Sequence, residues 1–264
     1  MYITIINDCC DPGTMSRQVV RMATLFPHIH ISPVAVNSYS DLEAAGLLID
    51  TLDASIGESG IILANVAPRH GKAKKWPNGT PFGHLKVGNT QIFATVDGLT
   101  LSLISKYGLA DSIEVYDIPT VLDAVIQQGK LEEGLRSVIT NTQFRSYEFL
   151  PRVAKWHNDG VELPFEKHLL SDFHSSPLAI WFVDNFGNCK TTAWAEDISH
   201  EPGKKIKTRF GEITCYDRLK DVPDGEPGLT IGSSGYGDKR FVELVVQGKN
   251  AAAHFGIKVG DKLI

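Results

Sequence analysis

Residues 60–66, with the sequence Gly-Ile-Ile-Leu-Ala-Asn-Val, set the strictest limit on the fold of this chain. A strand that is apolar at nearly every position is typical of a parallel sheet covered on both faces. Apolar segments at residues 2–7 and 30–36 come before it, and segments with helical spacing of apolar residues separate the three. Strands that alternate with helices predict an α/β domain with a mostly parallel sheet, which we assign to residues 1–163.

From about residue 164 onward the pattern changes to short strands. Turns rich in Gly, Pro, Asn and Asp separate six short segments, at residues 179–183, 191–195, 205–210, 212–216, 229–231 and 240–246. Turns at such close spacing are typical of an all-β domain. We therefore predict a β-barrel-like C-terminal domain at residues 164–264, and we interpret residues 232–235, Gly-Ser-Ser-Gly, as one of its turns.

Charge and hydropathy argue against two kinds of partner. The chain of 264 residues has a formal net charge of −5 at pH 7, whereas nucleic-acid binding needs a dense basic face. No segment approaches the roughly 20 apolar residues of a membrane-spanning helix. The apolar run after Met1 has no basic segment before it, so it is interpreted as a first strand and not as a signal peptide, which predicts a cytoplasmic location.

The cysteines and histidines do not have the spacing of a metal or redox site. Cys9 and Cys10 are adjacent and lack the C-x-x-C spacing, and Cys189 and Cys215 stand far from them. We expect all four to be buried or half-buried free thiols, because a chain that is not exported keeps its thiols reduced. The histidine spacing likewise predicts that the chain binds no metal. We also expect no cofactor.

Two C-terminal motifs carry a resemblance to a known family. Residues 183–188, Val-Asp-Asn-Phe-Gly-Asn, are followed by Thr191, and residues 232–236, Gly-Ser-Ser-Gly-Tyr, are followed by Gly-Lys-Asn-Ala-Ala at 248–252. These resemble the "D-x-F-G-N-x-x-T" and "N-S-x-G-Y…G-x-A-A" segments of the S-adenosylmethionine hydroxide adenosyltransferases. That family of SAM hydrolases also contains fluorinating and chlorinating enzymes. Looser, collinear matches at residues 7–8, 41–45, 97–99 and 149–151 extend the resemblance over nearly the whole chain.

The resemblance implies an adenosyl ligand that is clamped between the N-terminal domain of one subunit and the barrel of the next, in a homotrimer. Ligands of open α/β sheets bind at the carboxyl ends of the strands, where Asp8 and Asp11 follow the first strand. By position, Asp11 would hold the ribose hydroxyls, since a carboxylate can accept hydrogen bonds from two of them. Asp8 could instead cap the turn that follows it.

In the C-terminal domain the resemblance implies contacts to both ends of the ligand. Asp184 and Ser233 would hold the amino and carboxylate groups of the methionine part. Asn188 and the backbone near Val245 would read the adenine edge, and Phe186 would pack on its face. The ligand-binding candidates are therefore Asp8, Asp11, Asp184, Phe186, Asn188, Ser233, Ser234 and Val245.

The chain departs from the hydrolytic members where they activate water. Those members use an Asp, an Arg and a His, and the matching positions here hold Ala67, Lys74 or Lys75, and Phe144. Because an alanine cannot accept a proton or orient water, their site does not carry over. Arg69 and His70 are the polar groups that could form a rearranged site together with Lys74, so these three are the catalytic candidates.

Three functions stay open from the sequence. In the first, the protein binds S-adenosylmethionine or adenosine and catalyses nucleophilic substitution at the ribose C5′, releasing adenosine and methionine. In the second, it is a non-catalytic adenosyl-binding protein that has lost the water-activating triad. In the third, it is a structural homotrimer whose cleft binds another ligand.

Overall fold

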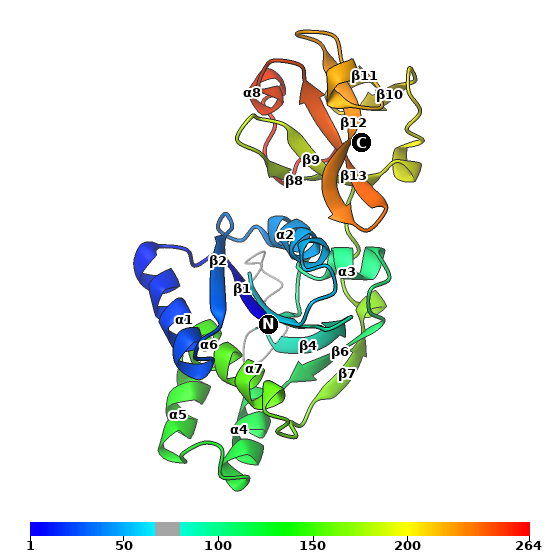
Figure 1. Ribbon diagram of the computed structural model, residues 1–264. Coiled ribbons are helices and arrows are strands. Elements are labelled where there is room, and N and C mark those ends of the chain that lie inside the picture. Colours follow the sequence, from blue (N-terminus) through cyan, green and yellow to red (C-terminus); the bar gives the residue numbers. More distant parts are fainter. Residues whose placement is uncertain (67–79) are drawn as a thin grey trace. The chain divides into compact units, whose positions relative to one another are not determined.

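The computed structural model describes residues 1–66 and 80–264, and it divides the chain into two compact units (Figure 1). The first unit consists of Met1–Ala44 and Ser55–His174. The second consists of Ala45–Ala54 and Ser175–Ile264. Helix α2, Asp41–Ala54, therefore contributes residues to both units.

A mixed sheet forms the centre of the first unit. Seven strands of the described segments follow one another in the order β2-β1-β3-β5-β4-β6-β7. The four strands β2, β1, β3 and β5 are parallel, whereas β4, β6 and β7 join the sheet antiparallel. Their bounds are β1 Tyr2–Asn7, β2 His30–Ala35, β3 Gly60–Asn65, β4 Phe82–Val87, β5 Thr90–Thr95, β6 Ser112–Tyr116 and β7 Glu166–Leu169. The predicted α/β class is confirmed, with an antiparallel part added to the parallel sheet.

The burial of β3 matches its sequence. Ile61, Ile62, Leu63 and Ala64 are at most 2% exposed, as expected for a strand covered on both faces. The core around this sheet includes Ile3, Ile5, Phe93, Phe149 and Trp156. The helices described in this unit are α1 Pro12–Leu25, α3 Ser102–Lys106, α4 Ile118–Gln127, α5 Gly134–Asn141, α6 Arg145–Glu148, α7 Leu150–Asn158 and the 3₁₀ turn η2 Leu170–Asp172.

The first helix begins at Pro12, directly after a capping residue. Asp11 is the N-cap, its side chain accepts a hydrogen bond from the backbone N–H of Thr14, and Pro12 occupies the first helical position. A carboxylate cap followed by proline is a strong start signal, since proline lacks the N–H that would otherwise be unpaired there. This start places Asp11 directly at the carboxyl end of β1.

The second unit contains two antiparallel sheets. Strands β12, β13, β9 and β8 form one, and β10 and β11 form a two-stranded ribbon. The bounds are β8 Ile180–Val183, β9 Cys189–Trp194, β10 Lys205–Thr208, β11 Gly211–Thr214, β12 Pro227–Tyr236, β13 Lys239–Val246, η3 Glu196–Ile198, η4 Leu219–Asp221 and α8 Ala251–Phe255. An isolated bridge between Cys215 and Leu229 connects the ribbon to β12. The strand pairs of the described residues do not close a barrel. The prediction is therefore confirmed as a separate region of antiparallel sheet, and the barrel is not confirmed.

The segment Gly-Ser-Ser-Gly at residues 232–235 lies inside β12 and is not a turn between strands, contrary to the prediction from its composition. The register of β12 against β13 shifts between Ile231 and Gly235, as in a β-bulge. A Cβ at position 232 would lie 2.3 Å from Glu243 Oε1, so a larger residue there would displace the Glu243 side chain. The glycines therefore allow a close approach within a strand.

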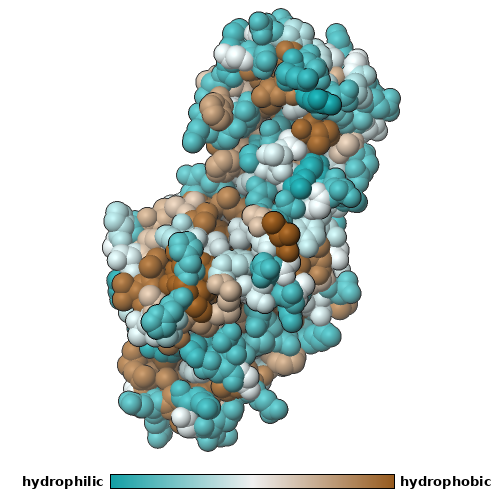
Figure 2. Space-filling model, viewed as in Figure 1, coloured by the Kyte–Doolittle hydropathy of each residue, from teal (hydrophilic) through white to brown (hydrophobic). Residues whose placement is uncertain are grey.

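None of the described helices combines the length and the apolar character that crossing a membrane requires. On the face shown in Figure 2, hydrophobic and hydrophilic side chains are mixed over the surface of each unit.

Candidate functional site

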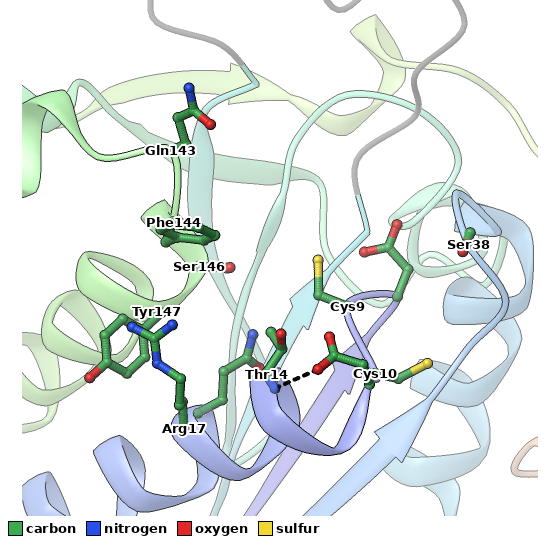
Figure 3. A pocket seen from close by; sticks show the side chains of 12 residues that line it. Cys9, Cys10, Thr14, Arg17, Ser38, Gln143, Phe144, Ser146 and Tyr147 are labelled. Carbon is green, nitrogen blue, oxygen red and sulfur yellow. Dashed lines mark hydrogen bonds between the residues drawn. The ribbon is translucent and has the colours of Figure 1, made fainter.

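A pocket of about 510 Å³ lies at the carboxyl ends of β1 and β2, within the first unit. One wall is formed by the turn after β1 and the start of α1, with Asp8, Cys9, Cys10, Asp11, Thr14, Arg17 and Gln18. Ser38 follows β2, and Gln143, Phe144, Ser146 and Tyr147 form the facing wall. Figure 3 shows Phe144 and Tyr147 opposite the beginning of α1. The structure thus brings Asp8 and Asp11 into one pocket at the edge where α/β proteins bind ligands.

Both carboxylates keep acceptor capacity toward this pocket. Asp11 Oδ1 accepts a hydrogen bond from the Thr14 backbone N–H at 2.9 Å, and Asp8 Oδ2 accepts one from Tyr39 at 3.1 Å. The hydroxyl and the backbone N–H of Thr14 lower the pKa of Asp11, so it is ionised at neutral pH. Because a carboxylate offers about four acceptor positions, each can accept further hydrogen bonds from hydroxyl groups.

Arg17 and Tyr147 are pocket residues that the sequence did not reveal. The Arg17 guanidinium lies 4.6 Å from the centroid of the Tyr147 ring and 5.8 Å from that of Phe144. The signal in the sequence is the helical spacing of Thr14, Arg17 and Gln18, which places them on one face of α1. A guanidinium over an aromatic ring gives this wall a positive group suited to a carboxylate or phosphate.

The cysteines correct one expectation. All four are free, but Cys9 and Cys10 are exposed, whereas Cys189 and Cys215 are buried. The thiol of Cys9 points into the pocket, and that of Cys10 points away from the Phe144 side and donates to the Val36 carbonyl (Figure 3). Burial raises the pKa of Cys189 to about 12, which makes that thiol unreactive.

The catalytic candidates Arg69, His70 and Lys74, together with Ala67, lie outside the described residues. Phe144, which stands near the position of the hydrolytic histidine, lines the pocket and is 57% exposed. A phenyl ring there can contact a ligand but cannot transfer a proton.

In the second unit, the turn at residues 184–188 is fixed by its own aspartate. Asp184 Oδ1 accepts hydrogen bonds from the backbone N–H groups of Phe186 and Asn188, at 2.8 and 2.9 Å. Asp184 Oδ2 accepts a third from the Asn188 side chain at 3.1 Å. The Phe186 side chain projects outward and is 79% exposed. Asp184 therefore holds a rigid turn that presents an aromatic ring to solvent.

Four polar side chains of the second unit, Asp50, Lys190, Ser234 and Glu243, form what we call the Lys190 cluster. Lys190 Nζ donates to Ser234 Oγ at 2.5 Å, and Ser234 Oγ donates to Asp50 Oδ2 at 2.8 Å. Glu243 is opposite Lys190 in the sheet register. Burial raises the pKa of Glu243, and the negative charge of Asp184 raises it further, whereas the positive charge of Lys190 lowers it. The cluster thus connects the two motifs that the sequence singled out.

The remaining candidates differ in accessibility. Ser233 is exposed and its carbonyl accepts a hydrogen bond from Arg240, whereas Ser234 is buried. Val245 is 1% exposed, so its side chain belongs to the core and only its backbone could contact a ligand. The last paired residues of β13 and β9 are Leu244 and Cys189, and the next positions along the two strands are Val245 and Asn188.

Replacement of Asp50 by asparagine is expected to change how stability depends on pH. Burial raises the pKa of Asp50, and this effect outweighs the hydrogen bonds from Ser234 and Gly235, which lower it. The folded state therefore keeps the Asp50 carboxyl protonated up to a higher pH than the unfolded state does. The carboxylate's contribution to stability therefore falls as the pH rises from its unfolded pKa, about 3.9, through the folded value. In thermal unfolding between pH 4 and 7, the unfolding temperature of Asp50→Asn should rise relative to that of the natural protein as the pH increases. Asp224→Asn, at an exposed position, controls for the loss of one negative charge, and parallel pH profiles for Asp50→Asn and the natural protein would refute this role.

The C-terminal part of the chain is similar to a known family. Residues 178–264 match the model of the SAM hydroxide adenosyltransferase C-terminal domain. The resemblance seen in the C-terminal motifs is therefore confirmed. No curated protein matches the chain.

Two solved structures share the fold over the whole length. An uncharacterized conserved protein from Thermotoga maritima is 16% identical, with a TM-score of 0.68 and 98% of each chain covered. A conserved hypothetical protein from Thermus thermophilus is 18% identical, with a TM-score of 0.60, over 100% of this chain and 99% of the other. At this level of identity the likeness concerns the fold alone.

Proposed function

We propose that this protein binds S-adenosylmethionine, or the adenosine derived from it, through the turn at residues 184–188 and the neighbouring Ser233. The observation that carries the proposal is the exposed Phe186 ring on a turn locked by Asp184, inside the segment that matches the family model. The exposed face of an aromatic ring can stack on an adenine ring. Asp11 of the first unit has the acceptor capacity to bind ribose hydroxyls. Homotrimeric assembly, which the resemblance implies, is part of this proposal.

The reaction in this proposal is substitution at the ribose C5′ by water. The water oxygen forms a bond to C5′ as the bond from C5′ to the sulfonium sulfur breaks, and methionine leaves with the electron pair. The proton released by the water passes to solvent, and the products are adenosine and methionine. A positively charged sulfur is a good leaving group, so positioning of the ligand supplies much of the acceleration.

Phe144 favours a second candidate, a non-catalytic adenosyl-binding protein. It lines the pocket of the first unit near the position where hydrolytic members carry a histidine, and it offers no group that activates water. In that case the protein would bind the ligand and leave it intact.

Calorimetric titration with S-adenosylmethionine and, separately, with adenosine tests the binding. We expect Phe186→Ala to weaken it about 5- to 150-fold, because stacking of a base on an aromatic ring contributes about 1–3 kcal/mol. Phe165→Ala removes a ring of the first unit that is also exposed, by 49%, and should bind as the natural protein does. Absence of binding to both ligands would refute the proposal.

Chromatography of the incubated mixture then separates the two candidates. Formation of adenosine and methionine in equal amounts supports the hydrolytic reaction. Binding without products supports the non-catalytic protein.

A further inference from the structure

A second group of side chains, away from the motifs, meets on the antiparallel part of the first unit's sheet. His84 on β4 and Glu114 on β6 are paired in the register, and His157 comes from α7 (Figure 1). One potential metal-ligating atom from each residue lies within 4.8 Å of those from the other two. The three residues are far apart in the sequence, so their spacing gave no sign of this group.

The geometry is close to that of a coordination site. His84 Nδ1 lies 3.0 Å from Glu114 Oε2, and the ring centroids of His84 and His157 are 3.9 Å apart. In a tetrahedral zinc site with bonds of about 2.0–2.2 Å, neighbouring ligand atoms lie about 3.4 Å apart. The three ligand atoms, all within 4.8 Å of one another, are therefore near the spacing of such a site.

A buried ring nitrogen in this group lacks a partner. His157 Nδ1 has no hydrogen bond among the described residues, whereas the side chain of Gln91 interacts with His84. Buried nitrogen atoms without a partner are rare in folded proteins because they lose their bonds to water. Imidazole nitrogens are among the ligands that zinc takes in proteins.

Residues around His84, Glu114 and His157 orient the Glu114 carboxylate and leave it accessible to solvent. The Tyr116 hydroxyl donates a hydrogen bond to Glu114 Oε2 at 3.5 Å. Such an outer hydrogen bond orients a ligating carboxylate. The Phe93 ring lies 4.7 Å from that of His84 and forms an apolar wall. The Glu114 side chain is 35% exposed, which gives an ion a route from solvent.

We propose that His84, Glu114 and His157 bind one zinc ion, with solvent as the fourth ligand, and so tie α7 to β4 and β6. Two imidazoles and one carboxylate are a ligand set that zinc accepts. This site is independent of the proposed adenosyl site.

Calorimetric titration of zinc into the chelator-treated full chain tests the proposal. We expect one zinc per chain and a rise in the unfolding temperature when zinc is added. Glu114→Gln and His157→Gln should each weaken binding at least about 100-fold, since loss of an outer-shell partner alone costs about 10- to 100-fold. His168→Gln is the matched control, because His168 also faces a glutamate, Glu166 at 3.4 Å, but lies outside the group.

Two further measurements distinguish this site from zinc bound by the exposed cysteines. Cobalt bound in place of zinc should show no thiolate charge-transfer band, and Cys9→Ser/Cys10→Ser should keep full affinity. In the unmodified chain, zinc should shift the ring nitrogen signals of two of its nine histidines, a readout that needs no variant to fold. The proposal is overturned if zinc does not bind, if Glu114→Gln and His157→Gln bind as tightly as the natural protein, or if the cysteine variant loses the ion.

Discussion

Replacement of Trp181 by alanine is expected to lower the free energy of unfolding of the second unit by about 3–5 kcal/mol, the usual cost of removing a large aromatic ring from a core. Trp181 is 0% exposed and packs edge-on against Phe241 at 6.3 Å between ring centroids. Urea unfolding followed by circular dichroism measures the change. Phe186→Ala removes an aromatic ring from the surface of the same unit and should change stability by less than about 0.5 kcal/mol. Similar losses in the two variants would contradict the packing described for Trp181.

Gly46 allows α2 to pack directly against the indole of Trp181. A Cβ at position 46 would lie 2.1 Å from Trp181 Cε3. Gly→Ala within a helix ordinarily stabilises by about 1 kcal/mol, but overpacking of a core costs about 1–3 kcal/mol. Gly46→Ala should therefore destabilise the natural protein and stabilise the Trp181→Ala variant, which has room for the methyl group. A double-mutant cycle measures this reversal of sign, and additive effects would show that the two residues are not in contact.

Gly187→Ala is expected to destabilise the second unit by about 2–5 kcal/mol and to abolish adenosyl binding. Gly187 has a φ of +85°, and a Cβ there would lie 2.1 Å from Asn250 Cγ. A left-handed conformation costs a non-glycine residue about 1–2 kcal/mol, and the overlap adds about 1–3 kcal/mol. Asn250 cannot easily move, because its side chain caps α8 by accepting from the Ala253 N–H at 2.7 Å.

Gly203→Ala is the matched control for Gly187→Ala. Gly203 has nearly the same φ, +83°, but a Cβ there would meet no atom within 4 Å. Thermal unfolding should therefore show only the backbone cost of about 1–2 kcal/mol for this variant. Equal losses for the two glycines would mean that the contact with Asn250 does not fix the turn.

The predictions from sequence succeeded where one local signal decides the structure. The apolar segment at residues 60–66 gave β3, since burial on both faces leaves no alternation in the sequence. The prediction missed β4, because His84 and Lys86 interrupt its apolar pattern. It also took residues 232–235 for a turn, since glycine marks both turns and close approaches within strands.

The candidate site residues also fall into two groups, those that a local sequence signal locates and those that only the folded chain brings together. Asp8 and Asp11 could be located because they directly follow the first strand, and Asp184 because its turn has a recognisable pattern. Tyr147 and Arg17 could not, because α6 and α1 meet only in the folded chain. The hydrogen bond between Lys190 and Ser234 likewise depends on how the strands pair, which their spacing in the sequence does not predict.

The ten residues Ala45–Ala54 limit how the C-terminal domain can be separated from the N-terminal one at the level of the gene. They belong to the second unit by their contacts, yet they are encoded within the first, more than a hundred residues upstream of its strands. Asp50 and Asp53 from this segment bind Ser234 and Arg240. A gene fragment that carries only the C-terminal domain would leave those groups and the space beside Trp181 unfilled. A single-point recombination between the units is therefore expected to give a destabilised C-terminal domain.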